Sequence, residues 1–255
     1  MITAHLASPG ESGRTPLVLL HAFPFDSRMW DEVVPLIADG VPVLTVDLPG
    51  MGEAPDPTDP PVLEVAADAV AEALRGHGPA VVAGLSMGGY IALALAERHP
   101  DVVAALGLLD TKAVADAPDA AANRRRIADE VERSGTVDAV RPMATALLGD
   151  STRTARPALV DRVGVWIGQQ RPAGVAWSQR AMAARPDRTA VLRSWDRPAL
   201  VLVGAEDGPT PPSVAAETAQ VLGVESVVVP AAGHLTAIED PAAVAGALNS
   251  LIQAV

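Results

Sequence analysis

Short apolar runs recur along this chain and alternate with segments of helical periodicity. The runs are continuously apolar rather than alternating with polar residues, which is typical of strands covered on both faces. They lie at residues 16–22, 41–52, 80–86, 102–111, 198–207 and 225–234. Because strands separated by helices form parallel sheets with right-handed crossovers, the sequence predicts an α/β fold: a mostly parallel central sheet flanked by helices.

The segments between these runs have apolar residues at helical spacing and, at their ends, residues that are typical of helix starts and stops. We expect helices over residues 27–40, 61–78, 87–100, 212–223 and 241–255. In a parallel sheet, ligands bind beyond the carboxyl ends of the strands. Polar residues directly after each strand are therefore the candidates for chemistry.

Residues 113–195 differ from the rest of the chain. They contain no convincing strand and are rich in alanine and arginine, with helical periods in 121–135, 136–149 and 156–170. We expect a helical cap inserted into a core formed by residues 1–112 and 196–255. From Thr111 to Arg197 the formal charge is +5, whereas the whole chain carries −12. This contrast favours a cap docked by charge complementarity, with attraction of anionic substrates as the alternative.

Composition narrows the classes of protein that the chain can belong to. The acidic charge disfavours nucleic acid as a partner. No apolar run reaches the roughly 18 residues of a membrane helix, and the first residues lack the pattern of a secretory signal. The absence of cysteine excludes disulfides and fits a cytoplasmic location. We expect a monomer or homodimer that acts on a small molecule, not at a membrane.

The segment "GLSMG", residues 84–88, lies between a strand and a helix. It fits the G-x-S-x-G nucleophile elbow, in which a sharp turn exposes the serine hydroxyl at the helix N-terminus. The motif alone is a weak signal, but the strand before it and the helix after it supply the required context. Ser86 is therefore the candidate nucleophile.

A serine hydroxyl needs a base, and the base needs a group that orients it. Asp207 and His234 follow the last two predicted strands, in the chain order Ser, Asp, His that an elbow serine requires. His234 is then the general base and Asp207 the orienting acid. Asp207 also fits a turn former, and Glu206 and Asp110 are rival acids. Met87 and Phe23 are expected to donate their backbone N–H groups to the oxyanion.

Four stretches together resemble the α/β-hydrolase superfamily: residues 17–52, 81–93, 200–212 and 231–241. The similarity is to small bacterial serine esterases and lactonases of the 3-oxoadipate enol-lactonase and cofactor-free haloperoxidase type. It implies the same triad and oxyanion donors, with no metal or cofactor. Ala22 departs from the glycine usual in that loop. The serine nucleophile argues against the dehalogenase and epoxide hydrolase branches, which use aspartate.

The resemblance predicts hydrolysis of a small carboxylic ester or lactone through an acyl-enzyme. The alternatives are C–C hydrolysis, perhydrolysis or a lyase step on the same triad, or a ligand sensor or partner-binding protein with weak activity. The substrate pocket is harder to predict. Four apolar cap residues either line it or form the cap's own core: Met143, Trp166, Trp177 and Met182.

Overall fold

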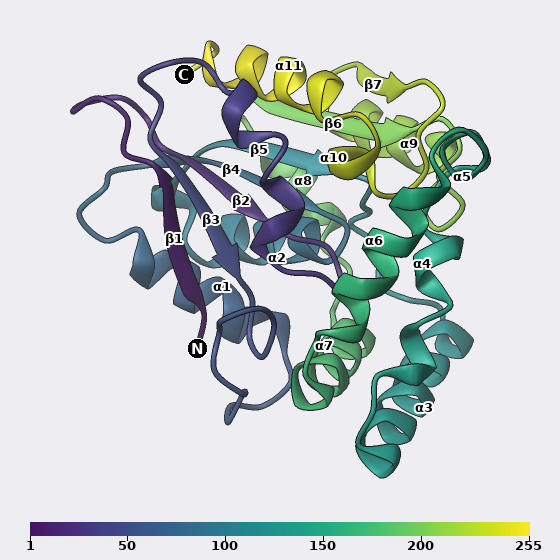
Figure 1. Cartoon of the computed structure of the whole chain (residues 1–255). Coiled ribbons are helices and arrows are strands. Elements are labelled where there is room, and N and C mark those ends of the chain that lie inside the picture. The colour runs from purple at the N-terminus through teal and green to yellow at the C-terminus, as the bar shows by residue number, and fades with distance from the viewer.

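A seven-stranded sheet forms the centre of the molecule in the computed structural model, which describes all 255 residues (Figure 1). The strand order is β1-β3-β2-β4-β5-β6-β7; β1 is antiparallel to β3 and the other pairs are parallel. The strands are β1 Thr3–Ser8, β2 Leu17–Leu20, β3 Val43–Asp47, β4 Ala80–Leu85, β5 Val103–Leu109, β6 Ala199–Gly204 and β7 Ser226–Val229. The predicted α/β fold with a mostly parallel sheet is confirmed.

The six predicted strands are present, and each is shorter than the apolar run that indicated it. Every residue of β2, β3 and β4 is buried, as expected for strands covered on both faces. Strand β1 was not predicted. It is a half-exposed edge strand, so it lacks the continuous apolar run that marks the central strands.

Helices cover both faces of the sheet. Helices α1 and α2 pack together on one face, where α8 and α9 extend the layer, and α11 covers the other face (Figure 1). The bounds are α1 Leu63–Ala73, α2 Met87–Arg98, α8 Thr189–Ser194, α9 Pro212–Leu222, α10 Thr236–Glu239 and α11 Pro241–Ile252.

The predicted helix over residues 27–40 is wrong. The chain forms two 3₁₀ turns there, Ser27–Trp30 and Val34–Leu36. The Asp26 carboxylate caps the first turn, and Pro35 cannot donate the backbone hydrogen bond that a continuous α-helix would need at that position.

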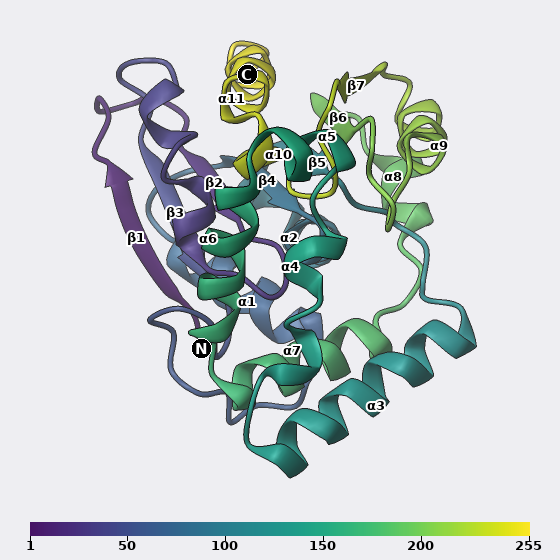
Figure 2. The same ribbon diagram turned by 45° about the vertical axis from the view of Figure 1, so that its right-hand side comes forward.

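Between β5 and β6 the chain contains helices and no strand. Helices α3, α4, α6 and α7 gather beside the sheet, and α3 packs along α7 (Figure 2). The bounds are α3 Pro118–Ser134, α4 Met143–Ala146, α5 Asp150–Ala155, α6 Pro157–Gly168 and α7 Pro172–Ala184. We refer to residues 113–195 as the cap, although its last helix, α8, packs against α2 and α9 of the sheet layer.

One hydrophobic core continues from the sheet into the cap. Val131 on α3, Ile167 on α6 and Val175 on α7 belong to the same buried cluster as the central strands. The cap is therefore fixed to the sheet by shared packing. No helix has the length and apolar character needed to cross a membrane.

Candidate active site

The turn between β4 and α2 holds Ser86 in a strained backbone conformation. Its φ is +53° and ψ is −110°, a region that side-chain-bearing residues rarely adopt. Two glycines make this turn possible. A Cβ on Gly84 would lie 2.2 Å from the carbonyl of Gly88, and one on Gly88 would lie 2.1 Å from the Leu20 carbonyl oxygen. The turn thus depends on both glycines and places the serine side chain beyond the strand end.

Ser86, His234 and Asp207 form a continuous hydrogen-bonded chain. The Nε2 atom of His234 lies 2.9 Å from the Ser86 Oγ, and Nδ1 lies 2.8 Å from an Asp207 carboxylate oxygen. His234 and Asp207 are 4% and 3% exposed. This geometry allows the imidazole to take a proton from the serine while the carboxylate fixes its orientation.

Thr210 holds the Asp207 carboxylate. Its backbone N–H donates to one carboxylate oxygen at 2.9 Å and its hydroxyl donates to the other at 2.7 Å. Thr210 was not among the predicted site residues. The Asp-x-x-Thr spacing at a strand end is typical of a turn in which the aspartate caps the backbone. This spacing is the sequence signal that could have identified Thr210.

The rival acids do not contact His234. The Asp110 carboxyl accepts the Gly204 N–H at 2.9 Å and contacts the Thr236 hydroxyl. Burial, and then the charge of Asp207, raises the pKa of Asp110 well above its usual range. Glu206 instead accepts hydrogen bonds from Ser151.

Two backbone N–H groups near the serine have no hydrogen-bond partner in the protein. They belong to Phe23, in the loop after β2, and to Met87, the first residue of α2. His21 anchors this loop: its Nδ1 lies 2.8 Å from the Ala22 carbonyl oxygen, and its Nε2 accepts the Leu48 N–H at 3.0 Å. Burial lowers the pKa of His21, so the ring stays neutral in this role. The two free donors are available to an anion.

Glu239, which was not predicted, fixes the loop that carries His234. One carboxylate oxygen accepts the Gly233 N–H at 2.9 Å and the Leu235 N–H at 3.1 Å, on either side of the histidine. The other oxygen accepts the N–H of Gly149 in the cap at 2.9 Å. Glu239 therefore joins the histidine loop to the cap.

A cavity of about 110 Å³ opens over Ser86 and His234. Met143, Leu147 and Met182 form its apolar wall from the cap. Two of the four predicted pocket residues thus lie on the cavity wall. Polar side chains complete the wall: Tyr90, Lys112, Arg124 and Thr210.

The two predicted tryptophans lie outside this cavity. The Trp177 indole is buried in the shared core and donates to the Asp59 carbonyl oxygen at 3.0 Å. Trp166 lies between Arg28 and Arg162, whose guanidinium carbons are 5.5 Å and 5.2 Å from its ring centre. Helical spacing marked these residues as apolar-face positions but did not distinguish packing from pocket lining.

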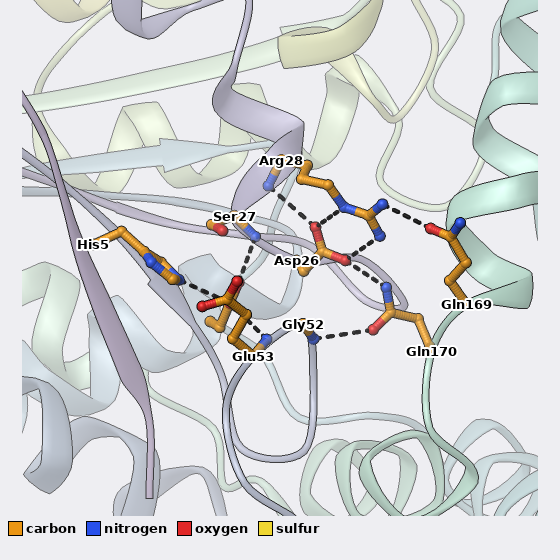
Figure 3. A pocket seen from close by; sticks show the side chains of 9 residues that line it. His5, Asp26, Ser27, Arg28, Gly52, Glu53, Gln169 and Gln170 are labelled. Atoms are coloured by element: carbon orange, nitrogen blue, oxygen red, sulfur yellow. Dashed lines mark hydrogen bonds and ion pairs between the residues drawn. The ribbon is translucent and has the colours of Figure 1, made fainter.

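A larger polar hollow of about 310 Å³ lies where the cap meets the loops after β2 and β3 (Figure 3). Gln170 donates to Asp26 at 2.6 Å and accepts the Gly52 N–H at 3.3 Å. Asp47 accepts the N–H groups of Ser27 and Glu53 at 2.7 Å and 2.8 Å. The lining of this hollow contains no nucleophile paired with a base. Its side chains form hydrogen bonds that hold the loops together. No group of three or more His, Asp or Glu in the structure is arranged to hold a metal ion.

The comparisons with known proteins identify the family. Residues 17–247 match the model of the alpha/beta hydrolase family. The chain is 33% identical over 210 residues to a pimeloyl-[acyl-carrier protein] methyl ester esterase of Neisseria meningitidis serogroup C, covering 76% of each chain. Its fold matches a malate-bound thermophilic esterase from Thermogutta terrifontis with a TM-score of 0.92 and 34% identity, over 99% of this chain and 93% of that one.

A more distant likeness extends to the enol-lactonase from Burkholderia xenovorans LB400. Its TM-score is 0.85 at 24% identity, over 99% of this chain and 96% of that one, which is a similarity of fold. The chain belongs to the α/β-hydrolase family. It is an enzyme of the hydrolase class, with esterases among its relatives.

Proposed function

We propose that this protein is a serine hydrolase that cleaves a small carboxylic ester or lactone through an acyl-enzyme. The observation that carries the proposal is the continuous chain from Ser86 through His234 to Asp207, with spacings of 2.9 Å and 2.8 Å. The esterases among the relatives support the same class of substrate.

In the acylation step, His234 takes the Ser86 proton as Oγ bonds to the substrate carbonyl carbon. The negative charge that develops on the carbonyl oxygen is stabilised by the N–H groups of Phe23 and Met87. His234 then protonates the leaving alcohol as its bond to the carbonyl carbon breaks. Water repeats the sequence on the acyl-enzyme, releasing the acid and restoring Ser86.

The cavity limits the size of the substrate. Its volume of about 110 Å³ is well below the roughly 300–1,000 Å³ that is common for drug-sized ligands. A short acyl group or a small lactone ring therefore fits this site better than a long chain.

The first test compares the wild type with Ser86→Ala on p-nitrophenyl acetate and butyrate. We expect hydrolysis by the wild type, with acetate and butyrate both accepted, and a fall to background in the variant. A fluorophosphonate probe should label the wild type on Ser86 and leave the variant unlabelled. Wild-type activity that survives Ser86→Ala would overturn the assignment. Labelling without ester hydrolysis would instead point to other chemistry on the same residues.

A further inference from the structure

The cavity over Ser86 carries positive charge, although the chain as a whole is acidic. Lys112 and Arg124 line the cavity, and no Asp or Glu does. The chain has 31 acidic and 19 basic side chains. A cavity wall with two cations and no carboxylate therefore has the opposite charge to the chain as a whole. The side chains of Lys112 and Arg124 are 25% and 24% exposed, which leaves them accessible to a ligand in the cavity.

Lys112 is the only lysine of the chain; the other 18 basic side chains are arginines. It lies just beyond β5, beside β4 and Ser86. Neighbouring Thr111 donates its hydroxyl to the Ser86 carbonyl oxygen at 2.8 Å, which fixes this segment against the elbow. A compact ammonium group with three donors therefore reaches the same cavity as the nucleophile.

The nearby carboxylate of Asp116 does not occupy all the hydrogen-bond donors of Lys112 and Arg124. Arg185 and Arg124 bind its two oxygens at 2.8 Å and 2.6 Å, whereas the Lys112 ammonium lies 3.5 Å away. Burial raises the pKa of Asp116, but the hydrogen bonds and charges of Arg185 and Arg124 outweigh it and hold the pKa far below the usual range. Three cations thus surround one carboxylate. The Nη2 of Arg124 and the donors of Lys112 make no hydrogen bond within the protein.

We propose that Lys112 and Arg124 form an anion subsite of the catalytic cavity, which binds a free carboxylate of the substrate. The inference rests on the proposed function and narrows it to esters or lactones of short acids that carry a second carboxylate. The small cavity places this carboxylate a few atoms from the reacting carbonyl. A charged hydrogen bond to Lys or Arg there binds the anionic substrate more tightly than a neutral one of the same length.

The kinetic test uses pairs of esters of equal chain length, in which one member ends in a carboxylate and the other in a methyl group. These are monomethyl glutarate against methyl valerate, and monomethyl succinate against methyl butyrate. We expect the wild type to favour the anionic member in kcat/KM by about tenfold to a hundredfold. Lys112→Met and Arg124→Met should remove most of this preference, lowering kcat/KM for the anionic ester far more than for its neutral partner.

Two controls define the role of charge. Lys112→Arg should retain most of the preference, because it keeps a cation at the same place. Arg125→Met removes the adjacent exposed arginine of α3 and should leave the preference unchanged. A wild type that favours the neutral esters, or variants that slow both members equally, would overturn the subsite while leaving the serine hydrolase assignment intact.

A binding test does not depend on catalysis. In Ser86→Ala, the single lysine and the Met1 amine are the two sites for an acetylating reagent, and mass spectrometry of peptides distinguishes them. Glutarate should slow acetylation of Lys112 relative to Met1 by about tenfold when the subsite is saturated, and valeramide should not. Equal rates with and without glutarate would contradict the proposal, whatever the kinetics show. Protection in a protein that hydrolyses no ester would separate failure of the proposed function from failure of the subsite.

Discussion

Asp110 and Asp207 are both buried at strand ends, but their surroundings give them different chemistry. Asp207 receives two hydrogen bonds from Thr210 and contacts His234. Asp110 lies behind it, where burial and the charge of Asp207 raise its pKa and favour the protonated form. A protonated Asp110 avoids a second buried carboxylate charge beside Asp207. The two positions should therefore respond differently to the same substitution.

Asp207→Asn should lower kcat by about a thousandfold or more, because the amide cannot stabilise the imidazolium or hold the imidazole with Nδ1–H facing it. Asp110→Asn should retain activity within about fivefold, since an amide resembles a protonated carboxyl and can still accept the Gly204 N–H. Steady-state kinetics on p-nitrophenyl butyrate measures both. A loss in Asp110→Asn equal to that in Asp207→Asn would mean that the acid has been assigned to the wrong residue.

The triad candidates could be nominated from sequence because each directly follows an apolar run, and parallel strands bring such residues to one edge. Glu239 acts on backbone groups that become neighbours only in the folded loops, so no spacing rule identified it. The same limit applies to Arg124. Its position over Ser86 depends on where α3 packs, which helical periodicity does not encode.

The cap and the histidine loop meet backbone to backbone at Gly149 and Gly233. A Cβ on Gly233 would lie 2.3 Å from the backbone nitrogen of Gly149, at the start of α5. Gly233→Ala should therefore displace the His234 loop, lowering kcat by about tenfold or more and reducing the melting temperature. Gly246→Ala is the matched control, because Gly246 is an exposed position of α11 where a Cβ would meet nothing within 4 Å. It should keep full activity and gain about 0.5–1 kcal/mol of stability.

Glu239, at the end of α10, accepts three backbone N–H groups from two elements. Glu239→Gln replaces one acceptor oxygen with an NH₂ group that faces a backbone donor. We expect kcat to fall by about tenfold with KM changed far less, because the imidazole moves relative to Ser86. Glu217→Gln, on an exposed position of α9, controls for loss of a carboxylate. Equal changes in kcat and KM would argue against a positioning role.

Elements buried on both sides were predicted well, and elements at the periphery were not. Strand β4 is fully buried, and its apolar run matched its extent closely. Strand β1 and the turns over residues 27–40 depend on neighbours instead: β1 on pairing with β3, and the turns on Asp26 and Pro35. Local pattern cannot report the pairing that forms β1, whereas Pro35 was a local signal against a continuous helix.

At the scale of the whole molecule, two hydrogen-bonded clusters are among the contacts that join the cap to the rest of the fold. One is Glu239 with Gly149 and Gly233; the other is the polar hollow of Figure 3, where Gln170 contacts Asp26 and Gly52. The charge contrast between cap and core predicted a docked unit. It could not predict these contacts, because several involve uncharged backbone groups.

Several ionised carboxylates stabilise this assembly, which makes acid sensitivity a property of the whole fold. Burial raises the pKa values of Asp26 and Asp47, but hydrogen bonds to Arg28 and to backbone N–H groups outweigh it, so both lie below their usual range. The two arginines that bind Asp116 lower its pKa further. A carboxylate whose pKa is lower in the folded state stabilises the fold above its unfolded pKa of about 3.9 and loses that contribution as pH falls further.

We therefore expect a melting temperature that is nearly constant from about pH 8 to 5 and falls steeply below about pH 4. Asp116→Asn should be less stable than the wild type at pH 7 by about 3 kcal/mol, because it leaves Arg185 buried without its partner. The gap should narrow as acid protonates Asp116 in the wild type. Asp119→Asn, an exposed neighbour in α3, should show no such gap. Calorimetry of the three proteins from pH 3 to 8 measures the effect. A gap that stays constant at low pH would show that the charge of Asp116 does not account for the difference in stability.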